Sequence, residues 1–185
     1  MKRLLVISLV LLLLLAGCGT GQRDGHLTDI STVTVEDLSA LFDENLHCVK
    51  NILVLGALPH TNTPVKNGHI YPVTNSVYHR YQELKDYLQT VYTATEVARL
   101  LESSENPLYL EIDGVLCVDI HRIGGKEYNV NWEGYSLVID SVDDTACRFT
   151  VTGKMPTADG GEEPYAITGS AVCEEGQLVL EKILY

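Results

Sequence analysis

The chain has 185 residues, which is enough for an N-terminal leader and one domain with a hydrophobic core. Its 25 acidic residues outnumber its 13 lysines and arginines, so the formal net charge is −12. This excess of negative charge argues against binding to nucleic acid and against a polybasic attachment to anionic lipid. It fits either a well-solvated acidic surface or a surface that attracts a basic partner.

The N-terminus carries two cations, then an almost entirely apolar run over residues 4–15, then two small residues directly before Cys18. A basic start followed by a short apolar run and small residues is typical of a secretory signal peptide. The run is too short for a bilayer span, which needs roughly 20 residues. We therefore predict that residues 1–17 form a signal peptide that is removed.

The cysteine at the predicted cleavage point resembles the lipobox of bacterial lipoproteins. By this resemblance, Cys18 becomes the N-terminus of the mature protein and carries acyl chains such as palmitate. An ordinary signal peptide with an incidental Cys18 is the alternative. Because two or more acyl chains anchor a protein stably, we expect an extracytoplasmic protein that is lipid-anchored to the bacterial cell membrane.

Cleavage before Cys18 leaves 168 of the 185 residues and raises the negative charge from −12 to −14, since two cations are lost. Residues 18–33 are polar and rich in Gly and Thr, so we predict a flexible tether with a mean reach of roughly 20 Å. Residues 34–185 contain no internal repeat and no change in amino-acid composition that would mark a domain boundary, so we predict that they form a single domain.

Three helices are predicted in the first half of this domain. Thr34 precedes an acidic first turn and an apolar pattern of helical period that runs to about Leu53. A loop with two prolines and a glycine follows over residues 60–75. A second helix is predicted over residues 77–92 with Ser76 as its cap, and a third, shorter helix is predicted to start after Thr93 with a capping box.

The period changes from helical to alternating at Leu108. Asp113-Gly114 between two apolar runs is a strong hairpin signal, because both positions tolerate positive φ. Further strands are predicted over residues 135–139, 147–152, 165–173 and 178–184, with a polar loop over residues 157–164. This order predicts an α+β fold in which N-terminal helices pack on a curved antiparallel sheet, similar to cystatin-like and nuclear-transport-factor-like architectures.

Motifs that would indicate catalysis or a cofactor are not found. No two of the six histidines have the three- to five-residue spacing of a local metal motif, and the acidic residues match no calcium loop. A nucleophile elbow and a phosphate loop are also missing. We therefore predict no metal, no cofactor and no enzymatic activity. A spatial pair of Cys117 with His121 is the remaining catalytic alternative, against a simple packed thiol at Cys117.

Four cysteines remain in the mature chain: Cys48, Cys117, Cys147 and Cys173. An even number outside the cytoplasm permits disulfides, and buried free thiols are the alternative. If the last long hairpin pairs Met155 with Tyr165, Cys147 lies opposite Cys173 at a distance that a disulfide can bridge. Cys48 and Cys117 would then remain as a second, helix-to-sheet pair.

Tyrosine dominates the aromatic residues, with ten Tyr, one Trp and two Phe. Tyrosine suits a surface that meets both water and a partner, because it joins apolar area to a polar tip. Four aromatic residues are predicted in loops or at strand ends and are the candidates for partner binding, with a structural role as the alternative for each: Tyr71, Tyr128, Trp132 and Tyr135.

Several stretches of the domain resemble the D,L-endopeptidase inhibitor family (IseA-type) of extracytoplasmic Gram-positive proteins. They are YHRYQELKDYLQTVYTATEVARLL (78–101), LYLEIDGVLCV (108–118), the segment from Gly124-Gly125 to Trp132, and RFTVTG (148–153). The resemblance implies inhibition of secreted NlpC-type cysteine peptidases, which cut peptidoglycan stem peptides, and hence restraint of autolysis.

Two functional hypotheses follow. In the first, the protein is a membrane-anchored, non-enzymatic regulator that occludes a cell-wall D,L-endopeptidase, with acidic residues that steer a basic partner. In the second, it is an envelope lipoprotein that binds a small ligand in a pocket of the curved sheet. A filled apolar sheet face would favour the first, and a pocket lined by several polar or ionisable groups would favour the second.

Overall fold

The computed structural model describes residues 29–124 and 129–185. The predicted signal peptide, Cys18 and the tether up to residue 28 lie outside the described residues. The helical elements are η1 (Ile30–Thr32), α2 (Val35–Cys48), η2 (Val49–Leu53), α3 (Tyr81–Gln89), α4 (Ala94–Glu102) and η3 (Ile120–Arg122). The strands are β1 (Ile70–Pro72), β2 (Tyr109–Ile112), β3 (Val115–Asp119), β4 (Asn131–Val142), β5 (Cys147–Pro156), β6 (Glu162–Glu174) and β7 (Gln177–Leu180).

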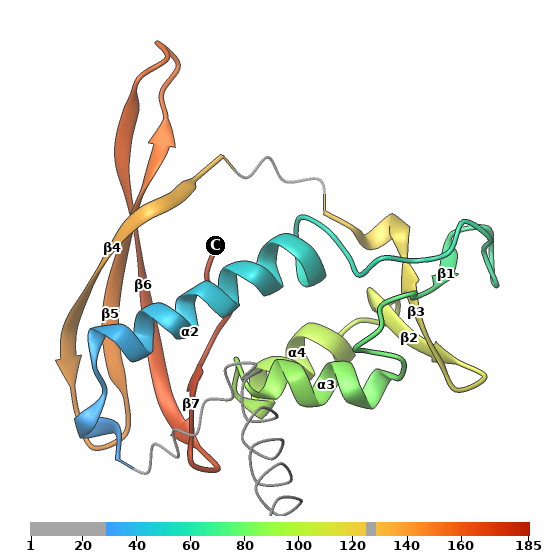
Figure 1. Cartoon of the computed structure of the whole chain (residues 1–185), viewed down its shortest axis with the longest axis horizontal. Coiled ribbons are helices and arrows are strands. Elements are labelled where there is room, and N and C mark those ends of the chain that lie inside the picture. The colour runs from blue at the N-terminus through green and yellow to red at the C-terminus, as the bar shows by residue number, and fades with distance from the viewer. Residues whose placement is uncertain (1–28, 125–128) are drawn as a thin grey trace, which may run out of the picture.

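The strands form two antiparallel sheets (Figure 1). The larger sheet has the order β4-β5-β6-β7, and the smaller has the order β1-β3-β2. The predicted α+β class with a curved sheet is confirmed. The prediction named one sheet, however, and the strands form two. β3 pairs with β1 on one edge and with β2 on the other, and none of these three strands pairs with the larger sheet.

The first predicted helix begins where its capping residues place it. The Thr34 hydroxyl accepts from the Asp37 amide at 3.2 Å, and the Asp37 carboxylate accepts from the Thr34 amide at 3.0 Å. This reciprocal pair satisfies two amides that the helix itself cannot satisfy. α2 ends at Cys48 and continues as one π-helical stretch to Leu53, the predicted limit of the pattern.

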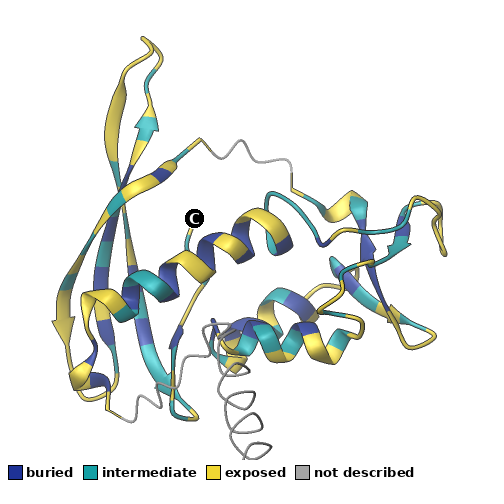
Figure 2. Ribbon diagram, in the orientation of Figure 1, coloured by how far each residue is buried: buried dark blue, intermediate teal, exposed yellow. Residues whose placement is uncertain are grey.

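α2 covers the concave side of the larger sheet, and buried residues in both elements form the core between them (Figure 2). Cys147, Phe149 and Val151 alternate along β5 and are fully buried, as their spacing predicts. From α2, Phe42 meets the rings of Trp132 and Tyr135 edge-on, at centroid distances of 5.2 and 5.0 Å. The helix and the sheet therefore share one apolar layer.

One buried amide joins α2 to two other parts of the chain. The side chain of Asn45 accepts from the Leu184 amide at 3.0 Å and donates to the Leu184 carbonyl at 2.8 Å. Its oxygen also accepts from the Tyr92 hydroxyl at 3.0 Å. Asn45 and Tyr92 are fully buried, so these bonds fix the C-terminal segment and the start of the α4 region against α2.

The second predicted helix is shorter than its pattern indicates. The Asn75 side chain accepts from the Val77 amide at 2.7 Å, which folds the chain into a turn, and Ser76 does not act as the cap. α3 begins only at Tyr81, where Glu83 accepts from the Arg80 amide at 3.0 Å. The third helix starts at its expected cap, because the Thr93 hydroxyl accepts from the Glu96 amide. The expected capping box is only half formed, since the Thr93 amide donates to the Leu180 carbonyl instead of to Glu96.

The Asp113-Gly114 hairpin is confirmed. Both residues have positive φ, 53° and 77°, and the flanking strands β2 and β3 pair from Ile112↔Val115 outward. Two consecutive left-handed residues make a tight turn whose twist matches that of the strands. This hairpin, with β1 on its other side, forms the smaller sheet.

The folded domain begins earlier than residue 34. Residues 29–33 were predicted as the end of the tether, but Asp29 caps η1 by accepting from the Ser31 amide at 2.9 Å. Ile30 and Val33 are 5% and 8% exposed and belong to the core. Burial of these two apolar side chains holds this short segment on the domain.

The predicted disulfides are not formed, and all four cysteines are free. In the hairpin of β5 and β6, Met155 pairs with Glu163 instead of Tyr165, so Cys147 lies opposite Ala171. The polar loop was predicted to run to Pro164, but strand pairing continues to Pro156↔Glu162. The turn therefore has only five residues, and this shorter turn shifts the register by two residues. Cys173 instead faces Leu178 on β7.

We predict that Asn45→Ala lowers the free energy of unfolding by about 2–4 kcal/mol, because the buried Tyr92 hydroxyl and the half-buried amide and carbonyl of Leu184 lose a partner at once. Urea unfolding measures the change. Asn51→Ala is the matched control, since Asn51 is exposed and bonds only to His47 one turn away. Equal stability of the two variants would contradict a structural role for the buried amide.

Candidate functional site

The concave face of the larger sheet is filled by protein. The inward side chains of β5 are fully buried beneath α2, and Phe42 occupies the space between α2 and β4. Packing of this kind leaves the interior of the sheet to side chains and not to a ligand. The alternative of a ligand pocket within the curved sheet is therefore not supported by this face.

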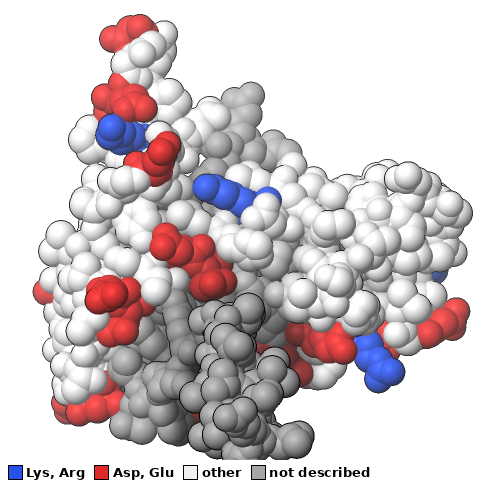
Figure 3. Space-filling view, in the orientation of Figure 1, with Lys and Arg blue, Asp and Glu red and all other residues white. Residues whose placement is uncertain are grey.

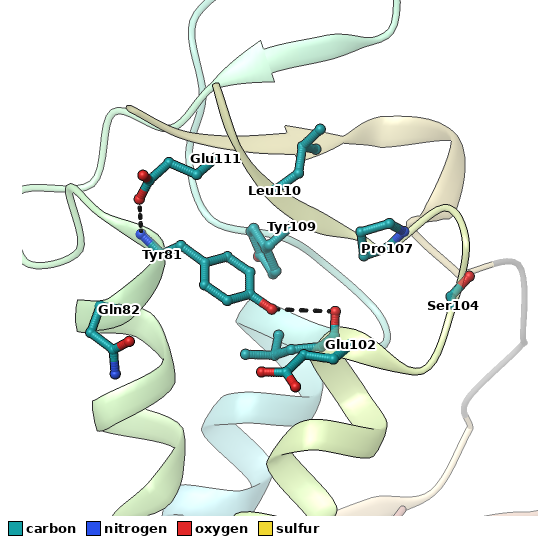
Figure 4. A pocket seen from close by; sticks show the side chains of 9 residues that line it. Tyr81, Gln82, Glu102, Ser104, Pro107, Tyr109, Leu110 and Glu111 are labelled. Carbon is teal, nitrogen blue, oxygen red and sulfur yellow. Dashed lines mark hydrogen bonds between the residues drawn. The ribbon is translucent and has the colours of Figure 1, made fainter. Parts of the chain in front are cut away.

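An open pocket of about 570 Å³ lies elsewhere, between α3, α4 and β2 (Figure 4). The Tyr81 ring crosses it, and its hydroxyl donates to the Leu101 carbonyl at 3.4 Å while its amide donates to Glu111 at 3.3 Å. Glu102 at the rim pairs with Lys85 at 2.6 Å. These polar groups are engaged with one another, so they do not converge on a shared point as in a specific ligand site.

Trp132 was predicted as a surface binding residue, and this is wrong. It is 3% exposed, and its ring lies 5.2 Å from Phe42 and 6.1 Å from Tyr165. β4 begins at Asn131, one residue earlier, so Trp132 is an inward-facing strand residue. Its ring packs over Gly153, where an added Cβ would lie 2.6 Å from Trp132 Cε3.

Tyr135 also has a structural contact. Its hydroxyl lies 3.0 Å from both the Ser39 carbonyl and a carboxylate oxygen of Asp43, and it donates to these α2 groups. Burial, followed by the hydrogen bond to Asp43, raises the pKa of Tyr135 to about 12. Tyr135 therefore links β4 to α2, and its polar tip is not directed to a partner.

Tyr71 lies on the smaller sheet. It lies half-buried in β1, its ring is 5.0 Å from that of His60, and its hydroxyl donates to the Gly68 carbonyl. Tyr128 lies outside the described residues. Tyr71 belongs to the smaller sheet and Tyr135 to the larger, so the predicted aromatic residues do not form one binding surface.

The thiols are held in their neutral form. Burial raises the pKa of Cys48 to about 11, and burial also raises the pKa values of the other three cysteines. Cys117 donates to the Val115 carbonyl, whereas His121 stacks on His69. Within the described part of the chain, the Cys117–His121 pair considered from sequence is not assembled.

A hairpin projects from the larger sheet. We call residues 154–164, the outer ends of β5 and β6 with their turn, the hairpin arm. It extends past the rest of the sheet in Figure 1. Every residue in it is exposed except Met155 and Thr157, which are half-buried. The sequence predicted only a polar loop over residues 157–164, but β5 continues to Pro156 and β6 begins at Glu162.

The tip of the hairpin arm is ordered by its own hydrogen bonds. The Thr157 amide donates to the Gly161 carbonyl at 2.9 Å, and the Gly160 amide donates to the Thr157 carbonyl at 3.0 Å. Asp159 accepts from the Thr157 hydroxyl and the Gly161 amide, and these bonds lower its pKa. The tip therefore has a defined shape before it meets any partner.

The hairpin arm is acidic, with Asp159, Glu162 and Glu163 against the single cation Lys154, which pairs with Glu162 at 3.3 Å. Figure 3 shows further acidic side chains over the larger sheet on the same face. Exposed charges of one sign raise the rate of encounter with a partner of opposite sign. The arm is therefore suited to a basic partner surface.

A second group of polar side chains gathers at the end of the smaller sheet. His69, Asp119 and His121 place one potential ligand atom each within 4.8 Å of the others. His69 Nδ1 lies 2.9 Å from Asp119 Oδ1, and the two imidazole rings stack at 4.3 Å. The spacing of histidines along the sequence does not reveal this group, because fifty residues separate His69 from Asp119. The pairing of β1 with β3 brings them together.

No known family model matches this chain, and no curated protein matches it in sequence. The resemblance to the D,L-endopeptidase inhibitor family therefore stays a prediction from the residues. Among the described residues, no helix has both the length and the apolar character that crossing a membrane requires.

We predict that Gly153→Ala lowers the free energy of unfolding by about 1–3 kcal/mol, since the added methyl group would overlap the Trp132 ring and the Asn131 carbonyl. Trp132 is the only tryptophan, so a red shift of its fluorescence reports exposure of its ring. Lys154→Ala, next in the strand and exposed, is the control. An unshifted emission with full stability would contradict the packing described for Trp132.

Proposed function

We propose that this protein is a lipid-anchored, extracytoplasmic regulator of the bacterial cell envelope that inhibits a cell-wall D,L-endopeptidase by steric occlusion. The single observation that carries the proposal is the hairpin arm. An exposed, ordered projection beside a filled core is suited to entering the cleft of another protein.

The shape of the hairpin arm supports this role. A two-stranded hairpin alone has little stability in water, but this one continues a long ladder whose lower part is buried beneath α2. Its tip is already ordered by the bonds of Thr157, Asp159 and Gly161. Binding through a preformed tip loses little conformational entropy, so more of the contact energy appears as affinity.

The edges of the hairpin arm favour contact through the tip over strand addition. β4 pairs with the arm only at Asn131↔Lys154, so the outer strands have free edges. Pro156 and Pro164 lack amide donors, and Lys154 places a charge on the edge. Such residues discourage pairing of exposed strand edges with other chains.

The charge of the hairpin arm supports a partner with a basic cleft rim. Opposite charges across an interface increase the association rate, and salt screens them. The exposed carboxylates of Glu162 and Glu163 lie where such steering would act. The mechanism needs no catalytic residue on this chain, because the partner's substrate is excluded by volume.

The alternative function, binding of a small ligand, has weaker support. The sheet face that would enclose a ligand is filled, and the groups at the open pocket near Tyr81 are bonded to one another. The proposed anchoring rests on the resemblance of the sequence before Cys18 to a lipobox, and a lipid anchor there would keep the domain beside the cell wall, where such peptidases act.

We predict that Cys18→Ala abolishes lipidation and releases the protein from the membrane, because the thiol that receives the acyl chain is lost. Labelling of cells with a fatty-acid analogue, followed by fractionation, measures both effects. The unmodified chain is the control. Retention of label by the variant would reject the lipobox assignment.

We also predict that the full-length protein, purified in detergent, inhibits an NlpC-type endopeptidase from the same envelope on purified peptidoglycan. Reversal of Glu162 and Glu163 to Lys should weaken inhibition about tenfold by slowing association. Added salt should weaken inhibition by the unmodified protein, since exposed charges are screened beyond about 10 Å at 0.1 M.

The matched control reverses Asp143 and Asp144, which are equally exposed and acidic but lie in the turn at the opposite end of β5. This control should inhibit like the unmodified protein. Equal loss in both variants would argue against the hairpin arm as the contact. No inhibition at micromolar concentration would reject the inhibitor proposal and place the ligand-binding alternative first.

A further inference from the structure

We infer that His69, Asp119 and His121 form a binding site for one divalent transition-metal ion of the zinc type. This inference is independent of the proposed inhibition, because the site lies in the smaller sheet and the hairpin arm lies in the larger (Figure 1). We refer to the three residues as the His-Asp-His site.

The backbone holds two of the three ligands in fixed register. Ile70 pairs with Asp119 across β1 and β3, and the Ile120 amide donates to the His69 carbonyl at 3.1 Å. The Asp119 amide donates to the Leu108 carbonyl at 2.8 Å on the other side. His69 and Asp119 are therefore positioned by a paired sheet and not by a loose loop.

The third ligand is positioned by the second. The Asp119 carboxylate accepts from the His121 amide at 3.0 Å and so caps η3, which places the His121 side chain beside His69. The two imidazole rings are nearly parallel, with an interplanar angle of 12°. The two nitrogen ligands and the oxygen ligand therefore lie in one small region of the fold. Because a metal lies in the plane of each imidazole that binds it, joint coordination requires the His121 ring to turn out of this stack.

The three ligand atoms lie close enough to meet one ion. Donors that each lie about 2.1 Å from a tetrahedral metal are about 3.4 Å apart. All three ligand atoms lie within 4.8 Å of one another. His69 Nδ1 and Asp119 Oδ1 are hydrogen-bonded at 2.9 Å, so an ion bound by both atoms would replace the proton that they share. His121 is exposed, so its side chain can turn to close the remaining distance without disturbing the core.

The carboxylate of Asp119 is one of three buried polar or charged side chains in the described structure, with Asn45 and Glu96. Its Oδ1 lies 2.9 Å from His69 Nδ1 and accepts from the His121 amide at 3.0 Å. Within the described ranges, its only ion-pair partner is this histidine, and no lysine or arginine pairs with it. Because a buried charge is stabilised by a nearby positive charge, a metal cation held by the same residues would fit this point.

The ligand set selects the class of metal. Imidazole nitrogens favour zinc, copper, nickel and iron, whereas calcium and magnesium require oxygen ligands. Three protein ligands, one of them at the surface, leave a further position for water or for a group from a partner. Among the described residues, no cysteine belongs to this group of ligand atoms.

The test is calorimetric titration of full-length protein in detergent with Zn²⁺, together with absorption spectroscopy of the Co²⁺-loaded protein. We expect one ion per chain, Co²⁺ bands of nitrogen and oxygen ligation, and a higher unfolding temperature with Zn²⁺. His121→Ala should weaken Zn²⁺ binding on the order of 100-fold or more, since loss of even an outer-sphere partner weakens binding 10–100-fold.

Asp119→Asn is the second variant, because it removes the charge but keeps an oxygen that can cap η3. It should weaken Zn²⁺ binding similarly while unfolding like the unmodified protein without metal. His60→Ala is the matched control: His60 bridges to Val73 beside the smaller sheet and lies outside the site. It should bind Zn²⁺ unchanged.

Four outcomes would overturn the inference. The first three are unchanged Zn²⁺ affinity in both His121→Ala and Asp119→Asn, equal loss in the His60→Ala control, and no binding at micromolar Zn²⁺. The fourth is a thiolate-to-cobalt charge-transfer band, which would place the ion on the cysteines. His121 is exposed, so its substitution tests the site even if Asp119→Asn does not fold.

Discussion

The fold depends on the contacts that α2 makes on two sides. On one side, Phe42 packs edge-on against Trp132 and Tyr135 of β4. On the other, the buried side-chain amide of Asn45 bonds to Leu184 in the C-terminal segment and to Tyr92, which lies between α3 and α4. Without Asn45, the buried Tyr92 hydroxyl would lose its Asn45 partner, and the Leu184 amide and carbonyl would lose theirs. One helix therefore sets the position of the larger sheet, the C-terminus and α3–α4 together.

Because the centre is filled, the features suited to binding lie at the periphery and at opposite ends of the molecule. The hairpin arm is a continuation of β5 and β6, and all its residues except Met155 and Thr157 are exposed. The His-Asp-His site lies where β1 and β3 end their pairing. A rigid core can support both, since each is attached through strands and not through free loops.

Local signals in the sequence predicted the elements well where the structure is also local. The Thr34 cap, the Thr93 cap and the Asp113-Gly114 turn each depend on residues within a few positions of one another. Errors arose where contacts are distant. The pairing of Cys147 with Cys173 failed by two residues of register, and Trp132 was assigned to the surface because the start of β4 was placed too late.

The sequence by itself led to the prediction of a signal peptide and lipobox, and it determined the α+β class, the starts of α2 and α4, and the inward residues of β5. These follow from hydrogen bonds and hydrophobic periods that act over a few residues. Only the tertiary structure decided that the strands form two sheets, that the hairpin arm projects, and that His69 meets Asp119 and His121. Such placements depend on which strand edges pair and in which register, and the burial of the whole core selects that pairing, which no short segment encodes.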